Sequence, residues 1–169
     1  MGDIGAAGFS LNNLALAAYI RADLPRALAY SRESVAVFRD LSNQPSLAEA
    51  LTTQGRVLGA AGDLEAALAS LVEALSLSWA AGPRSIVAVS LEAMATLAIA
   101  QSMAAHAVKL CAAATALRSS IRAPLPPYNA AEYGRTLRRA RDLLSDLEFA
   151  DAWTMGMTLP VDQIVGTRR

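Results

Sequence analysis

Apolar side chains recur along most of the chain at the three- and four-residue spacing of amphipathic helices. These apolar runs, and the polar and Pro/Gly residues that separate them, predict helices at about residues 9–21, 24–41, 47–60, 64–80, 84–101 and 103–120. No strand is expected. The pattern therefore predicts an all-α protein.

The six predicted helices form a repeat with a period of 40 residues. When the chain is shifted by 40 residues, Leu11 aligns with Leu51 and Asp23 with Asp63, within seven identities. A further shift brings a weaker third unit into register. We expect three helical hairpins, at about residues 9–41, 47–80 and 84–121. Small residues recur where the two helices of each hairpin are expected to cross, namely Ala15, Ala27 and Ser34, then Gly55, Ala67 and Ala74, then Ala95, Ala107 and Ala114.

Helix-capping residues fit the same register. Asp23 and Asp63 stand where they cap the second helix of a hairpin, and Met103 replaces them in the third unit. Ser46 and Glu49 have the spacing of a capping box and are predicted to open the second unit.

The last third of the chain departs from the repeat. The Pro-rich residues 122–127 predict an extended connector, because residues before proline avoid helical geometry. Beyond it we expect a helix at about 129–144, then a short helix opened by a Ser145–Glu148 capping box, with Gly156 as its C-cap. The predicted organisation is three hairpins over residues 1–121, the connector 122–127, and capping helices over 128–169.

The residues at the crossing positions resemble the tetratricopeptide repeat. The resemblance is carried by Leu14-Ala15, Ala27 and Ser34, by Gln54-Gly55, Ala67 and Ala74, and by the turn AGDLEAAL at 61–68. It implies a right-handed superhelix of helical hairpins that binds proteins or peptides. The period of 40 and the C-terminal segment KLCAAATALRSSIRAPLPPYNAAEYGRTL are similar to the C-terminal regions of bacterial LuxR-type transcriptional regulators and signalling ATPases.

This sequence lacks both the nucleotide-binding motif and the DNA-binding motif of such regulators. It contains no GxxxxGK[ST] phosphate loop and no helix-turn-helix segment after Val165. We therefore expect no direct nucleic-acid binding by this chain, which we interpret as a fragment or a degenerate relative of a longer regulator.

Composition narrows the possible functions. Of the 169 residues, 54% are apolar and 18% charged, and the net charge is zero. This excludes an intrinsically disordered protein and a dedicated nucleic-acid binder. The single cysteine excludes a disulfide framework. Without a targeting segment or an apolar run long enough to span a bilayer, we expect a cytoplasmic protein that does not bind membranes.

Candidate chemistry is sparse. His106 and Cys111 lie five residues apart, which places them about 140° apart around a helix, so they cannot share a metal ion. We expect no catalytic, cofactor-binding or metal-binding residue, no cofactor, and no enzymatic activity. The densest basic cluster is formed by Arg135, Arg138, Arg139 and Arg141. We interpret it as a solvated face, and the alternative is a docking patch for an acidic partner or phosphate.

The strongest functional hypothesis is a peptide-binding groove. In arrays of helical hairpins the first helix of each unit lines the concave surface. The side chains predicted to line it are Asn12, Asn13, Leu16, Tyr19, Thr52, Arg56, Glu92 and Thr96. Such a groove is shallow and nearly neutral, and it suits an apolar helix or an extended peptide.

The predicted function is therefore a protein- or peptide-interaction module, a scaffold or sensor within a bacterial signalling or transcriptional regulator. Self-association is an alternative, as a homodimer through an open N-terminal repeat face. Two others are DNA binding by a longer parent protein and small-molecule binding in the concavity of the array.

Overall fold

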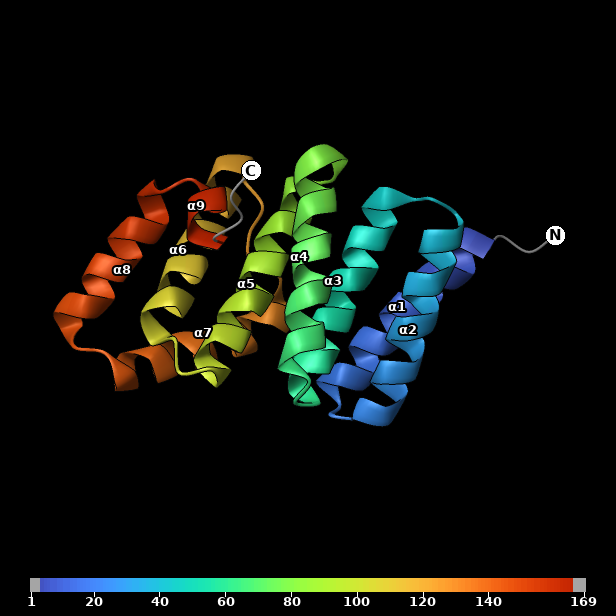
Figure 1. The fold of residues 1–169 in the computed structure, drawn as a ribbon, viewed down its shortest axis with the longest axis horizontal. Helices are drawn as coiled ribbons and strands as arrows, with labels where there is room; N and C mark the ends of the chain where they lie inside the picture. The colour runs from blue at the N-terminus through green and yellow to red at the C-terminus, as the bar shows by residue number, and fades with distance from the viewer. Residues whose placement is uncertain (1–3, 166–169) are drawn as a thin grey trace. The chain divides into compact units, whose positions relative to one another are not determined.

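The computed structural model describes residues 4–165, which form helices and connecting turns without a strand (Figure 1). Contacts divide the chain into two compact units, one ending at Val87 and the other beginning at Ala88. The predicted all-α, tetratricopeptide-like fold is confirmed. The helices are α1 (Ile4–Ile20), α2 (Leu24–Asp40), α3 (Gln44–Ala60), α4 (Leu64–Ala81), α5 (Arg84–Ala100), α6 (Ala104–Ile121), α7 (Pro127–Leu143), α8 (Asp146–Thr158) and α9 (Val161–Val165).

Left-handed residues terminate the helices at a regular interval. They are separated by 20 or 40 residues and are Ala22, Ser42, Gly62, Ser102 and Arg122, with φ between 52° and 89°. After α1, the amide of Asp23 donates to the carbonyl of Ala18, and equivalent bonds close α2, α3 and α5. This is the Schellman geometry, which satisfies the carbonyls at a helix end. Gly82 breaks the series with an extended backbone, because the residue before Pro83 avoids helical geometry.

After the turns at Ala22, Ser42, Gly62 and Ser102 the next helix begins two residues later, whereas a connector separates Arg122 from α7. The side chains of Asp23 and Asp63 accept hydrogen bonds from the amides of Arg26 and Ala66, so both predicted caps are confirmed. Met103 occupies the same position before α6 and makes no side-chain cap bond.

The predicted capping box at Ser46 is wrong. The N-cap of α3 is Asn43, whose side-chain oxygen accepts a bond of 3.2 Å from the amide of Ser46. Pro45 lies in the first turn, where a missing N–H costs nothing, so the helix begins at Gln44 and Ser46 is buried inside it.

The small residues of the repeat lie where the hairpin helices meet. All nine are buried, eight of them with no exposed surface: Ala15, Ala27, Ser34, Ala67, Ala74, Ala95, Ala107 and Ala114. Ser34 also donates a hydrogen bond of 2.9 Å to the carbonyl of Gly8, which ties α2 to α1. The crossing positions that the sequence predicts are therefore the close-packed positions of the structure.

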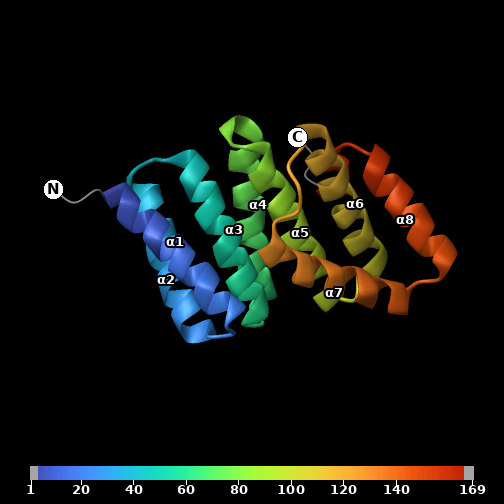
Figure 2. The same cartoon turned by 180° about the vertical axis from the view of Figure 1, so that it is seen from behind.

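The second unit contains two kinds of helix packing. α8 lies alongside α6, whereas α7 runs across α5 and α6 (Figures 1 and 2). Ser145 and Glu148 form the predicted capping box at the start of α8. Gly156 is not a C-cap, because α8 continues to Thr158 and a Cβ on Gly156 would collide with the backbone of Lys109 on α6. This glycine allows the close approach of α8 to α6.

Candidate functional site

Six of the predicted groove residues lie in the first unit, on α1 and α3, which contact each other. Asn13 is exposed, Leu16 and Tyr19 are partly exposed, and Asn12 and Thr52 are almost fully buried. The guanidinium of Arg56 lies over the ring of Tyr19, 5.1 Å from its centroid. This cation–π contact joins α3 to α1. The structure therefore brings Tyr19 and Arg56 together, with Leu16 and Asn13 further along α1.

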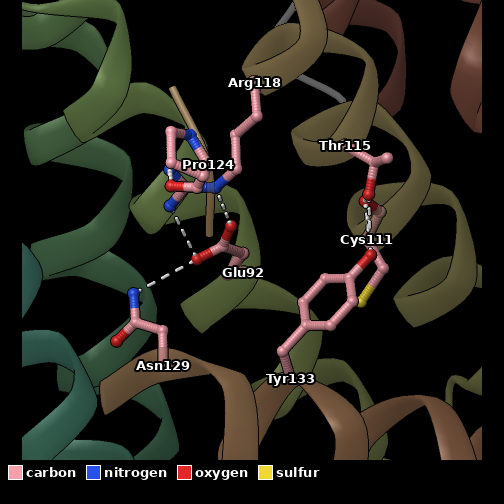
Figure 3. A network of polar contacts seen from close by, with 7 residues as sticks. All are labelled: Glu92, Cys111, Thr115, Arg118, Pro124, Asn129 and Tyr133. Atoms are coloured by element: carbon pink, nitrogen blue, oxygen red, sulfur yellow. Dashed lines mark hydrogen bonds and ion pairs between the residues drawn. The ribbon is translucent and has the colours of Figure 1, made fainter. Parts of the chain in front are cut away.

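The other two predicted groove residues, Glu92 and Thr96, lie on α5 in the second unit. The Glu92 carboxylate accepts two hydrogen bonds from Arg118 on α6, 2.6 Å from Nε and 3.1 Å from Nη2 (Figure 3). Both side chains are 8% exposed. Asn129 on α7 donates a third bond of 3.3 Å to Glu92, and Arg118 Nη1 donates to the carbonyl of Pro124. The buried carboxylate is thus paired and hydrogen-bonded, as a desolvated charge requires.

Further polar contacts connect α7 to α5 and α6. The hydroxyl of Thr136 lies 3.1 Å from that of Thr96. The phenol of Tyr133 lies 2.7 Å from the hydroxyl of Thr115 and donates to the carbonyl of Cys111 (Figure 3). Burial raises the pKa of Tyr133 to about 12, so the phenol stays protonated and able to donate. The side chains of Glu92 and Thr96 are therefore already in contact with α7, a helix of the same chain.

A cavity of about 410 Å³ lies beside this network, within the size range of small-molecule pockets. Arg122 at its edge is exposed. The lining is formed by α5, the C-terminal end of α6, the connector and α7, through Glu92, Thr115, Arg118, Ser119, Arg122, Ala123, Pro124, Leu125 and Tyr133.

Burial shifts the pKa values of two titratable residues on α6, Cys111 and His106. Cys111 is fully buried, and burial raises the pKa of its thiol to about 12, with a smaller contribution from the charge of Glu92. Burial, and then the charge of Lys109, lower the pKa of His106. Within residues 4–165, no group of three His, Cys, Asp or Glu side chains is arranged to hold a metal ion.

The basic cluster lies on α7, away from its buried face. Arg135, Arg138 and Arg139 are exposed, while the guanidinium of Arg141 stacks 4.2 Å above the ring of Phe149. The buried residues of this helix are Asn129, Thr136 and Ala140. Sequence reasoning missed Asn129, Thr136 and the polar role of Tyr133. The spacing of these polar residues, four and then three apart on one helix face, is the signal that points to them.

Comparison with known proteins gives a match for part of the chain. Residues 7–78 match the family model of the tetratricopeptide repeat. Such repeats generally mediate protein–protein interaction. No curated protein and no solved structure gives a significant match to the chain. In the part of the chain that the structure describes, no helix is long and apolar enough to cross a membrane.

Proposed function

We propose that this protein is a protein- or peptide-interaction module. The observation that carries the proposal is the tetratricopeptide-repeat match over residues 7–78, which spans both hairpins of the first unit. The partner would bind to the surface of α1 and α3 through Asn13, Leu16 and Tyr19. The remaining predicted contacts in this unit, Asn12, Thr52 and Arg56, would support this surface from below, since all three are buried.

The side chains of this surface favour a particular kind of partner. Tyr19 and Leu16 supply apolar area, Asn13 supplies an amide that can bond a peptide backbone, and Arg56 already stacks on Tyr19. A nearly neutral surface of this kind suits an amphipathic helix or an extended apolar peptide better than an acidic tail.

A displayed library of random peptides tests this proposal. Peptides selected on the protein are expected to lose binding when Asn13→Ala or Tyr19→Ala is introduced, and to keep it with Arg32→Ala on α2, which is exposed and outside the surface. Selection of peptides that ignore both substitutions on α1 would reject this surface as the binding site.

We further propose that the module is the regulatory part of a cytoplasmic bacterial regulator. The support is the similarity of the 40-residue period and the C-terminal segment to LuxR-type regulators and signalling ATPases. Any DNA binding would then belong to other domains of the parent. An immunoblot of the native host with an antibody against this segment distinguishes the cases. A band near 18 kDa would contradict a multidomain parent, and a band several times larger would support it.

Self-association is a second candidate, favoured by exposed apolar side chains on α1. Ile4, Leu14 and Ile20 are 62%, 48% and 58% exposed. Pairing of two α1 helices would remove some of this apolar surface from water. Sedimentation equilibrium is expected to show a dimer that Leu14→Arg dissociates, while Leu147→Arg, at an exposed position on α8, leaves it intact. A monomer at all concentrations would reject this candidate.

Small-molecule binding is a third candidate, favoured by the cavity beside Arg118 and Tyr133. A ligand that fills it is expected to raise the Tm of the protein by mass action. The stabilisation should vanish in Ala123→Trp, which fills the cavity with the protein's own side chain. Stabilisation that survives this substitution would place the ligand elsewhere.

A further inference from the structure

α7 is not one of the stacked helices of the second unit. α8 lies alongside α6, in contact with Lys109 and Ala112 through Gly156, and it buries Phe149 and Ala152 (Figure 2). α7 instead crosses α5 and α6, between the proline-containing connector 122–126 and the short link 144–145. α8 therefore packs directly on α6, with no part of α7 between them.

The contacts that dock α7 are mostly polar. Of its three buried residues, only Ala140 is apolar. Asn129, Tyr133 and Thr136 lie four and three residues apart and reach Glu92, Thr115 and Thr96 respectively. α7 therefore contacts α5 and α6 through a few placed hydrogen bonds, in addition to the apolar contact of Ala140.

The receiving surface is formed without any contribution from α7. The ion pair of Glu92 with Arg118 joins α5 directly to α6. Thr115 is oriented by its own bond of 2.9 Å to the carbonyl of Cys111. The Glu92–Arg118 pair and the bond of Thr115 are thus made within α5 and α6 and need no residue of α7.

Docking leaves one polar atom of α7 itself without a hydrogen-bond partner in the part of the chain that the structure describes. The side-chain nitrogen of Asn129 donates a hydrogen bond to Glu92, whereas the side-chain oxygen Oδ1 of Asn129 is buried. This oxygen has no hydrogen-bond partner among the described residues, and the same is true of Oδ1 of Asn12 in the first unit. A buried acceptor without a donor weakens binding, because its lost hydration is not replaced. A helix that supplies a donor without an orphaned acceptor would bind this surface more tightly than α7 does.

We propose that the α5–α6 surface is a helix-binding site whose ligand within the chain is α7, and that a partner helix with hydrogen-bonding side chains spaced like Asn129, Tyr133 and Thr136 competes with α7 for it. The proposal rests on the proposed function, because it extends the interaction surface to Glu92 and Thr96. It names the partner as an amphipathic helix with a donor at position i, a phenol at i+4 and a hydroxyl at i+7.

The test uses the full chain and a synthetic peptide of residues 122–145 with a fluorescent label. Asn129→Asp places a carboxylate against Glu92 without changing the size of the side chain, so it should release α7. Ala130→Asp adds the same charge at an exposed neighbouring position and is the matched control. Hydrogen exchange reports whether α7 has undocked, and fluorescence anisotropy reports binding of the peptide.

The Asn129→Asp chain is expected to bind the peptide at least about tenfold more tightly than the wild type or the Ala130→Asp chain, because a larger fraction of its sites is open. A peptide carrying Tyr133→Phe and Thr136→Val should lose this binding. An undocked α7 with no binding of the wild-type peptide would overturn the proposal.

A second variant keeps the proposal falsifiable if Asn129→Asp does not undock α7. The hydroxyls of Thr96 and Thr136 are close enough for Thr96→Cys/Thr136→Cys to form a disulfide that locks α7 in place. The oxidised chain should not bind the peptide, and reduction should restore binding to the wild-type level. Equal binding in both redox states would overturn the proposal. That result would not affect the peptide-library test on Asn13 and Tyr19. Failure of the α7 proposal can therefore be distinguished from failure of the proposed function.

Discussion

A Cβ added to Gly55 on α3 would lie 2.6 Å from Cγ of Leu71 on α4. No ordinary side-chain contact is that short, so the two helices cross with no space for even a methyl group at this point. Leu71 has no exposed surface and cannot move aside into water. The glycine is therefore a packing requirement of the second hairpin, at the position where Ala15 and Ala95 stand in the other two.

We expect Gly55→Ala to lower the free energy of unfolding by about 1–3 kcal/mol, the usual cost of overpacking a close contact. The loss should appear even though alanine is the better helix former by about 1 kcal/mol. Gly134→Ala on α7 is the control, since its Cβ would approach only the flexible end of Arg138. Urea unfolding followed by circular dichroism measures both. A Gly55→Ala protein as stable as the control would contradict this account.

The buried ion pair of Glu92 with Arg118 leads to a second prediction. Glu92→Gln leaves the Arg118 guanidinium buried without a counter-charge, which should cost about 3–5 kcal/mol. The matched control is Glu73→Gln, because Glu73 pairs with Arg39 at the same distance of 2.6 Å while both side chains are about half exposed. An exposed pair contributes at most about 1 kcal/mol. Similar losses in the two variants, measured by chemical unfolding, would refute the difference.

The helices and their crossing points could be predicted because their causes are local. Helical periodicity, the caps at Asp23 and Asp63, and the small residues at fixed spacing all act within one or two turns of the chain. The start of α3 was mispredicted because Asn43 and Ser46 are both good caps and Pro45 is compatible with either start, since it is tolerated in a first turn as well as before a helix.

The docking of α7 could not be predicted, because its causes are distant in sequence. From the sequence, Glu92 was predicted to be a groove residue on α5. Its hydrogen-bond partners Arg118 and Asn129 lie 26 and 37 residues further along the chain. A buried polar side chain such as Thr136 also does not appear in the hydrophobic pattern, so the pattern does not show which face of α7 is buried. The sequence therefore predicted a helix close to α7 but not the contacts that this helix makes with α5 and α6.

The turn before α6 offers a stabilising substitution. Met103 has φ −94° and ψ 60°, close to the values at Asp23 and Asp63, yet it makes no side-chain cap bond. We expect Met103→Asp to stabilise the protein by about 1 kcal/mol, since an aspartate here can accept a bond from the first turn of α6. Met103→Ala separates this gain from the removal of an exposed apolar side chain. Equal thermal stability of the two variants would show that no cap has formed.

The last prediction concerns alkaline pH. Burial raises the pKa of Cys111 from 9.0 to about 12 and that of Tyr133 from 10.0 to about 12, so both groups keep their protons in the folded state where an unfolded chain would lose them. Their contribution to stability is complete below about pH 9 and is lost progressively as the pH rises toward 12. Cys111→Ala and Tyr133→Phe should each flatten this loss in urea unfolding measured at pH 8, 9.5 and 10.5. Since Cys111 is the sole cysteine, alkylation at pH 8.5 is an independent check. The thiol should react in urea and stay unmodified in the native protein, and rapid modification of the native protein would show that the site is open to solvent.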